Sequence, residues 1–121
     1  MSSFTIYHNP RCSKSRQALQ LLEQAGVEPT VVKYLDSPLD AATLDQLLTW
    51  LGMTPQQLMR TGEGVYGELG LAKRQLSRQE AIALLVAHPI LIERPIVVSG
   101  ERAVVARPPE RVQELLSPVK G

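Results

Sequence analysis

The chain has 121 residues, of which 44% are hydrophobic and 21% charged, and its formal net charge is +1. This balance is typical of a globular protein, and we expect residues 1–121 to form a single domain. The charge excludes a large basic field for nucleic acid or for an anionic membrane surface. No apolar run reaches the ~20 residues of a membrane span, and the N-terminus lacks a signal-peptide pattern. We therefore expect a cytoplasmic location.

The first third of the chain predicts a strand, a helix and a second strand. Phe4-Thr5-Ile6-Tyr7 is rich in β-branched and aromatic residues, as strands are. Residues 13–25 carry apolar side chains at helical spacing, and Gly26 ends the run. Residues 30–34 predict the second strand. A β-α-β unit of this kind favours a right-handed crossover and parallel strands.

The middle of the chain is predicted to be helical. Asp40 is a candidate N-cap for a helix through residue 51. Thr54-Pro55-Gln56-Gln57 combines an N-cap, a proline at the first helical position and a reciprocal glutamine, which predicts a short helix toward residue 60. A glycine-rich loop is expected over residues 61–71. Ser77-Arg78-Gln79-Glu80 is a second capping box, which opens a further helix.

The last third predicts a hairpin and a closing helix. Residues 96–98 and 103–105 are two short apolar strands, and Ser99-Gly100-Glu101-Arg102 between them is a hairpin signal. Pro108 and Pro109 mark the start of the last helix. The order β-α-β, helices, β-β-α predicts an α/β, thioredoxin-like fold with a mixed sheet and a helical insertion.

The single cysteine, Cys12, lies where the first predicted strand passes into the first helix. Backbone N–H groups and the dipole at a helix N-terminus favour an anion and lower a thiol's pKa. Arg11, Lys14 and Arg16 add positive charge nearby. A buried structural cysteine does not normally have such neighbours, so we predict that Cys12 is a reactive thiolate. One cysteine cannot form an internal disulfide, which agrees with a reducing compartment.

Spacing excludes two kinds of cofactor site. His8 and His88 are far apart and Cys12 stands alone, so no cluster has the spacing of a metal site. Residues 62–67 match G-x-G-x-x-G literally, but the match follows a predicted helix and lacks the surrounding dinucleotide unit. We therefore interpret residues 62–67 as a loop.

Three arginines from separate predicted elements are candidates for binding an oxyanion. Arg94 directly precedes Pro95, which stands just before a strand, where thioredoxin-like folds place a cis-proline facing the active cysteine. Arg107 follows the last strand, and Arg60 lies beside the glycine-rich loop. Guanidinium groups donate paired hydrogen bonds to tetrahedral oxyanions and do not lose their proton. Convergence of the three on one thiol would create an oxyanion pocket.

Four segments, in order along the chain, form a pattern that spans nearly all of it. They are Tyr7-His8-Asn9-Pro10-x-Cys12-x-x-Ser15-Arg16, Tyr66-x-Glu68-Leu69-Gly70-Leu71, His88-Pro89-Ile90-Leu91-Ile92-x-Arg94-Pro95-Ile96-Val97-Val98 and Arg107-Pro108. The pattern resembles that of the glutaredoxin-dependent arsenate reductases, and the first and third segments are specific to them.

The resemblance implies that Cys12 is a nucleophile that attacks arsenic in arsenate and expels water. Arg60, Arg94 and Arg107 match arginines that bind arsenate and arsenite, with Met59-Arg60-Thr61 matching mainly by position. Glutathione, a co-substrate, then adds to the adduct and reduces it to a Cys12-bound As(III) species. Glutaredoxin removes the glutathionyl group, and arsenite leaves. No bound cofactor is implied, and the lack of a second cysteine agrees, because an external thiol must resolve the intermediate.

The same resemblance implies that His8 and Ser15 help to stabilise the thiolate. A Ser15 hydroxyl one turn into the helix is placed to act by hydrogen bonding, while His8 would act by charge or by orienting the loop. Packing of the loop is an equally supported role for His8. Arg11 and the pair Ser13-Lys14 add charge where better-known members carry small neutral residues, which indicates a divergent branch.

Two other functions remain open beside arsenate reduction. One is a thiol enzyme with the same pocket, acting on another oxyanion or on a glutathione mixed disulfide. The other is a non-enzymatic regulator, because Spx-type proteins share this fold and bind RNA polymerase. Those regulators usually carry a Cys-x-x-Cys redox switch, whereas Ser15 stands in place of the second cysteine here. The arsenate reductase hypothesis is therefore favoured.

Overall fold

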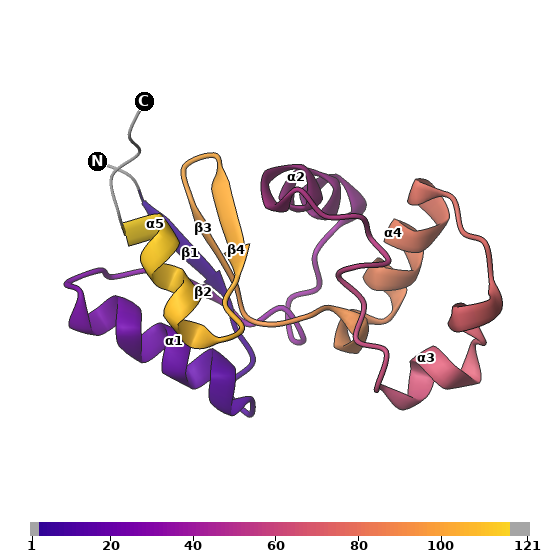
Figure 1. The fold of residues 1–121 in the computed structure, drawn as a ribbon, viewed down its shortest axis with the longest axis horizontal. Helices are drawn as coiled ribbons and strands as arrows, with labels where there is room; N and C mark the ends of the chain where they lie inside the picture. The colour runs from indigo at the N-terminus through magenta and orange to yellow at the C-terminus, as the bar shows by residue number, and fades with distance from the viewer. Residues whose placement is uncertain (1–2, 117–121) are drawn as a thin grey trace. The chain divides into compact units, whose positions relative to one another are not determined.

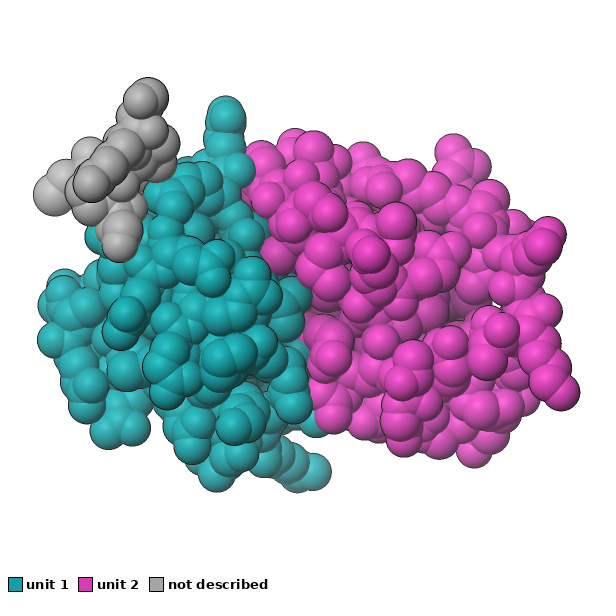
Figure 2. All heavy atoms as spheres, viewed as in Figure 1, with its two compact units in different colours: residues 1–37, 94–121 teal, residues 38–93 magenta. Residues whose placement is uncertain are grey.

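The computed structural model describes residues 3–116, which fall into two compact units (Figure 2). The sheet unit consists of the described parts of Met1–Ser37 and Arg94–Gly121, and the helical unit is Pro38–Glu93. Compact units need not be separate folding domains, so the single domain expected over residues 1–121 stays a prediction. Residues 1–2 and 117–121 of that range lie outside the described residues.

The sheet unit contains a mixed four-stranded sheet, shown in Figure 1. Its strands are β1 (Phe4–Tyr7), β2 (Thr30–Val32), β3 (Ile96–Ser99) and β4 (Arg102–Val105). Their order is β2-β1-β3-β4, with β1 parallel to β2 and antiparallel to β3, which in turn is antiparallel to β4. The mixed sheet and the α/β class are confirmed.

One face of the sheet is buried under helices of the same unit. Ile6 pairs with Val97 and Val97 pairs with Val104, so these three side chains share a face. The helices that cover it are α1 (Ser13–Gln24), the 3₁₀ turn η3 (Pro109–Val112) and α5 (Gln113–Leu116). Their buried contributions are Ala18, Leu22, Val112 and Leu115. This packing fixes the N-terminus of α1 beside the end of β1, which positions Cys12.

The helical unit is built from α2 (Ala41–Leu51), α3 (Gly64–Glu68) and α4 (Arg78–Ala87), with the 3₁₀ turns η1 (Leu71–Lys73) and η2 (Pro89–Leu91). Two predicted caps are present. The Thr43 N–H donates to the Asp40 carboxylate at 2.8 Å, and Ser77 and Glu80 form a reciprocal capping box. An ion pair of 2.8 Å between Arg78 and Asp45 links α4 to α2.

The prediction of a short helix from Thr54 toward residue 60 is wrong. Thr54 and Gln57 do form the expected reciprocal hydrogen bonds, at 2.9 and 3.1 Å. The chain makes only turns there, because Met59 leaves the helical path and pairs with Ile92 in an isolated antiparallel bridge. Local capping was therefore outweighed by a contact with a distant segment.

The glycine-rich segment 61–71 is also more ordered than a loop. It contains α3 and the first residue of η1, and the Leu69 N–H donates to the Val65 carbonyl at 3.0 Å. Gly70 lies between α3 and η1 with φ of +62°, a left-handed conformation that glycine adopts without steric cost.

Two further boundaries differ by a few residues. The second strand ends at Val32 because the N–H groups of Asp36 and Ser37 both donate to the Lys33 carbonyl and start a turn. The last helix begins as the 3₁₀ turn η3 before it becomes α5. Among residues 3–116, no helix is long and apolar enough to cross a membrane.

Candidate functional site

Cys12 occupies the position immediately before α1, at the end of the loop that follows β1. Its N–H donates to the Asn9 carbonyl at 3.0 Å, and its extended backbone (φ −95°, ψ 122°) makes it the N-cap residue of the helix. The side chain is half-buried. The thiol therefore lies at the positive end of the α1 dipole, as the sequence predicts.

A buried hydrogen-bond network holds this loop. The Ser15 hydroxyl lies 2.6 Å from His8 Nδ1 and accepts the Asn9 N–H at 3.1 Å. The Arg11 N–H in turn donates to the Asn9 side-chain oxygen at 3.0 Å. His8 and Ser15 are only 5% and 0% exposed, so these contacts are shielded from water. The network ties both ends of the loop to the first turn of α1.

The protonation of His8 follows from its surroundings. Burial lowers the pKa of His8, and the positive charges of Lys33 and Arg16 lower it further. The imidazole is therefore neutral at pH 7, which allows the Ser15 hydroxyl to donate to Nδ1 while accepting from Asn9. Among the described residues, no hydrogen bond joins the Ser15 hydroxyl to the Cys12 sulfur. The roles predicted for His8 and Ser15 toward the thiolate stay predictions.

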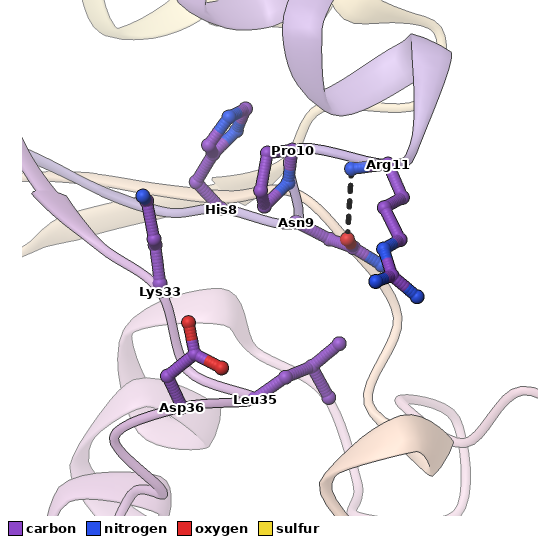
Figure 3. Close-up of a pocket in the computed structure, with 7 residues that line it drawn as sticks. All are labelled: His8, Asn9, Pro10, Arg11, Lys33, Leu35 and Asp36. Atoms are coloured by element: carbon purple, nitrogen blue, oxygen red, sulfur yellow. Dashed lines mark hydrogen bonds between the residues drawn. The ribbon is translucent and has the colours of Figure 1, made fainter.

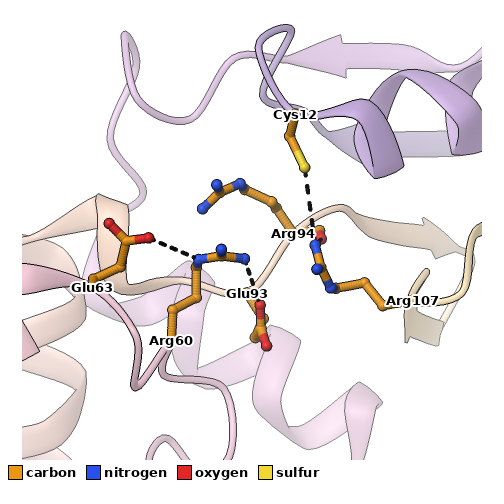
Figure 4. Close-up of polar contacts among 6 residues, drawn as sticks. All are labelled: Cys12, Arg60, Glu63, Glu93, Arg94 and Arg107. Carbon is orange, nitrogen blue, oxygen red and sulfur yellow. Dashed lines mark hydrogen bonds and ion pairs between the residues drawn. The ribbon is translucent and has the colours of Figure 1, made fainter.

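Two arginines of the sheet unit lie at the thiol (Figure 4). Arg107 Nη1 donates to the Cys12 sulfur at 3.9 Å and to the Arg94 carbonyl at 3.1 Å. The peptide bond between Arg94 and Pro95 is cis, and the bond between Arg107 and Pro108 is cis as well. The Ala106 N–H donates to the Pro95 carbonyl at 2.9 Å, so the two arginine-proline segments are held together.

The Arg94 guanidinium has unused donors. Its Nε and Nη1 atoms are buried and have no hydrogen-bond partner among residues 3–116. Leaving a buried donor unpaired costs about 1–3 kcal/mol, and more for a charged group. Buried unpaired donors in a native protein call for a specific explanation. Because a guanidinium stays charged, the partner that best suits these donors is an oxyanion beside the thiol.

The pKa of the Cys12 thiol is lower than that of an ordinary cysteine. Burial raises it, but this effect is outweighed by the backbone N–H groups of Ser15 and Lys14 and by the hydrogen bond and charge of Arg94. The sulfur makes no full capping hydrogen bond, so the stabilisation is shared among these several donors. Such a thiol is a nucleophile at neutral pH.

The lowered pKa predicts the pH dependence of Cys12 alkylation. Because the folded pKa lies below that of an ordinary thiol, the rate of reaction with iodoacetamide should reach its half-maximum at a lower pH in folded than in urea-unfolded protein. Arg94→Gln should move the folded midpoint upward, since it removes a charge that favours the thiolate. Equal midpoints for folded and unfolded protein would contradict the assignment.

Arg60 belongs to the helical unit, where two carboxylates hold it. Its Nε lies 3.2 Å from the Glu63 carboxylate and its Nη1 lies 2.9 Å from that of Glu93 (Figure 4). The backbone N–H of Arg60 donates to the Leu91 carbonyl at 2.7 Å. All these contacts lie within one unit, so they do not test whether Arg60 takes part in the oxyanion pocket.

Some features of the site were missed by the sequence analysis. Asn9 holds the loop through both its N–H and its side chain, and an asparagine two residues before Arg11 is a recognisable turn signal. The contact of Arg107 with the Arg94 carbonyl has no local signal, because the two are far apart in sequence.

No group of three or more His, Cys, Asp or Glu residues within 3–116 is arranged to hold a metal ion.

Comparisons with known proteins agree with this architecture. The model of the ArsC family matches residues 7–115. An arsenate reductase of Neisseria meningitidis serogroup B is 43% identical over 117 residues, which are 96% of this chain and 100% of that protein. The uncharacterized protein YfgD of Escherichia coli K12 is 54% identical over 112 residues, which are 92% and 94% of the two chains.

Solved structures are similar over the same range. An arsenate reductase from Vibrio cholerae superposes with a TM-score of 0.90 and 46% identity, covering 93% of this chain and 97% of that one. An arsenate reductase related protein from Brucella melitensis gives 0.69 and 25%, with 96% of each chain covered.

Proposed function

Because this chain belongs to the ArsC family, we propose that it reduces arsenate to arsenite in the cytoplasm, with glutathione and glutaredoxin as reductants. The observation that carries the proposal is the Cys12 thiol, whose pKa is lowered and which lies against Arg107 and the unpaired donors of Arg94. This arrangement combines a nucleophile with donors for the oxygens of its target.

In the first step, the Cys12 thiolate attacks arsenic and forms a sulfur–arsenic bond. One arsenate oxygen takes up two protons and leaves as water, and arsenic remains As(V). Arg94 and Arg107 donate to the oxygens that stay, which offsets the negative charge gathered around the centre. Their guanidinium groups keep their charge throughout, so they act as donors rather than as acids.

The second step requires thiols from outside the chain, since the sequence holds one cysteine. Glutathione adds to arsenic through its sulfur, and a second oxygen leaves as water. Electron balance places the reduction at the removal of the glutathionyl group rather than at the addition of glutathione. A glutaredoxin thiolate attacks the glutathione sulfur and forms a mixed disulfide with it, and the electron pair of the arsenic–glutathione bond stays on arsenic, which becomes As(III). Hydrolysis of the remaining sulfur–arsenic bond releases arsenite and restores the Cys12 thiolate.

His8, Ser15 and Arg60 have supporting roles in this proposal. The hydrogen bonds of Ser15 to His8 and Asn9 hold the loop, so both side chains position the thiol and keep the helix donors aimed at it. Arg60 serves as a third oxyanion donor, with Glu63 and Glu93 fixing its side chain. Pro95 shapes the segment that carries Arg94.

The test is arsenate-dependent oxidation of NADPH, coupled through glutathione, glutaredoxin and glutathione reductase. The wild-type protein should show turnover that needs arsenate, glutathione and glutaredoxin together. Turnover with glutaredoxin replaced by thioredoxin and thioredoxin reductase would support arsenate reduction but contradict the proposed reductant. Absence of turnover, with a reactive Cys12 thiolate still measured by alkylation, would exclude arsenate as the substrate.

A second candidate is the same chemistry on another tetrahedral oxyanion or on a glutathione mixed disulfide. It is favoured by the donors of Arg94, which suit any oxyanion of this shape, and by the 54% identical relative, whose name assigns no activity. Competition separates the two candidates. An oxyanion that protects Cys12 from alkylation at much lower concentration than arsenate would favour the second.

A further inference from the structure

The loop that carries Cys12 also forms one wall of a pocket, which Figure 3 shows. The pocket has a volume of about 360 Å³ and lies entirely within the sheet unit. His8, Asn9, Pro10 and Arg11 line one side, and Lys33, Leu35 and Asp36 line the other. Its size is at the lower end of the range for small-molecule sites, which suits a ligand no larger than a short peptide.

Three charged side chains face this pocket without ion-pair partners. Neither Arg11, Lys33 nor Asp36 makes a salt bridge with any residue in the described range 3–116. In Figure 3, Lys33 and Arg11 lie on opposite sides of the pocket, and the Asp36 carboxylate lies on the Lys33 side. The pocket therefore offers two separated cationic groups and one anionic group beside one of them.

We propose that this pocket binds the thiol co-substrate, and that its ligand is glutathione. The role of glutathione as a co-substrate rests on the proposed function, whereas its binding to the pocket follows from the charges of the lining residues. Glutathione carries two carboxylates at opposite ends and one ammonium next to one of them. Lys33 and Asp36 pair with the carboxylate and ammonium of the γ-glutamyl end, and Arg11 pairs with the glycine carboxylate.

The uncharged lining fits the middle of such a ligand. Pro10 and Leu35 supply apolar surface for its carbon chain, and Leu35 is 37% exposed, so its side chain is accessible to a ligand. Cys12 does not itself line the pocket, but Arg11 directly precedes it in the chain, and an extended tripeptide spans ~10 Å. A ligand anchored at Arg11 can therefore present its central thiol to an adduct on Cys12.

The same charges argue against arsenate as the occupant. A small dianion would gain from the two cations but would be repelled by Asp36. The unpaired donors that suit an oxyanion belong to Arg94, which does not line this pocket. Oxyanion and co-substrate thus have separate binding groups, Arg94 for the first and Arg11, Lys33 and Asp36 for the second.

The binding test uses S-methylglutathione, which cannot react, and follows backbone amide NMR signals of the whole protein. In the wild-type protein, millimolar ligand should shift signals of the pocket residues. Lys33→Glu should raise the dissociation constant roughly tenfold, because it turns an attraction into a repulsion. Lys73→Glu is the matched control, since Lys73 is exposed in η1 of the helical unit, and it should bind as the wild type does.

A second variant addresses the ammonium. Asp36→Asn should weaken binding of S-methylglutathione but not of its N-acetylated form, which has no ammonium. In the arsenate assay, Lys33→Glu should raise the KM for glutathione and leave the KM for arsenate unchanged. The pocket proposal is overturned if wild-type protein shows no shifts at these residues, or if Lys33→Glu and Lys73→Glu behave alike. Binding with these properties in a protein that does not turn over arsenate would support the pocket while refuting the proposed function.

Discussion

Cys12→Ser is expected to abolish arsenate-dependent NADPH oxidation, with kcat/KM falling at least about a thousandfold. A serine hydroxyl at this position stays protonated at neutral pH, because donors that lower a thiol's pKa cannot bring an alcohol into range. It also forms no sulfur–arsenic bond for glutathione to attack. The coupled assay measures the loss, and an unchanged thermal unfolding midpoint verifies the fold.

The matched control moves the thiol by one residue. In Cys12→Ser/Ser13→Cys, the sulfur would stand on the first residue of α1, which is exposed and, within residues 3–116, makes no hydrogen bond with Arg107. We expect this variant to remain inactive, although it again contains one cysteine. Activity in the double variant would mean that any exposed thiol at this helix end suffices, and the assigned geometry would then be wrong.

Arg94→Ala should lower kcat/KM for arsenate about a hundred- to thousandfold, the loss typical of removing a donor aimed at developing charge. Both the KM for arsenate and kcat should respond, since Arg94 also lowers the Cys12 pKa. Arg94→Lys should recover only part of the activity, because an ammonium lacks the paired donors. Arg74→Ala, which removes an exposed arginine of the helical unit, is the control.

The stability of the same variant distinguishes function from folding. The buried Nε and Nη1 of Arg94 have no partner, so removing them should not lower the free energy of unfolding. We expect denaturant unfolding of Arg94→Ala to occur at the same or a higher concentration than in wild type. A variant that loses both activity and stability would instead place Arg94 among the structural contacts.

Predictions from sequence succeeded where the deciding contacts are local. Asp40 and the pair Ser77 and Glu80 cap their helices within a few residues, and the helices follow. Cys12 lies at a helix N-terminus because a strand pattern is followed at once by a helix pattern, and no distant residue had to be known. The Thr54 segment failed for the opposite reason, since pairing of Met59 with Ile92 decides its path.

The features of the site also divide into those set by local sequence and those set by distant contacts. The backbone N–H groups of Ser15 and Lys14 belong to the helix that follows Cys12, so their part in lowering the Cys12 pKa could be inferred from sequence, whereas the part of Arg94 could not. The contact of Arg107 with the sulfur depends on the pairing of β4 with β3 and of β3 with β1, which spacing alone does not give. The unpaired donors of Arg94 could not be predicted at all, because a sequence does not reveal which polar atoms lack partners.

The unsatisfied guanidinium of Arg94 bears on how the protein selects its substrate. Donors of this kind respond to charge and tetrahedral shape, and phosphate shares both with arsenate. If hydrogen bonds alone decided recognition, the donors of Arg94 would bind whichever of the two anions is more abundant. Discrimination between arsenate and phosphate must then come after binding, when the Cys12 sulfur attacks the central atom of the anion. Arsenic exchanges its oxygens for sulfur readily, and phosphorus does not. Under the proposed function, phosphate is thus a competitor that delays the reaction, and the covalent step provides the discrimination against it.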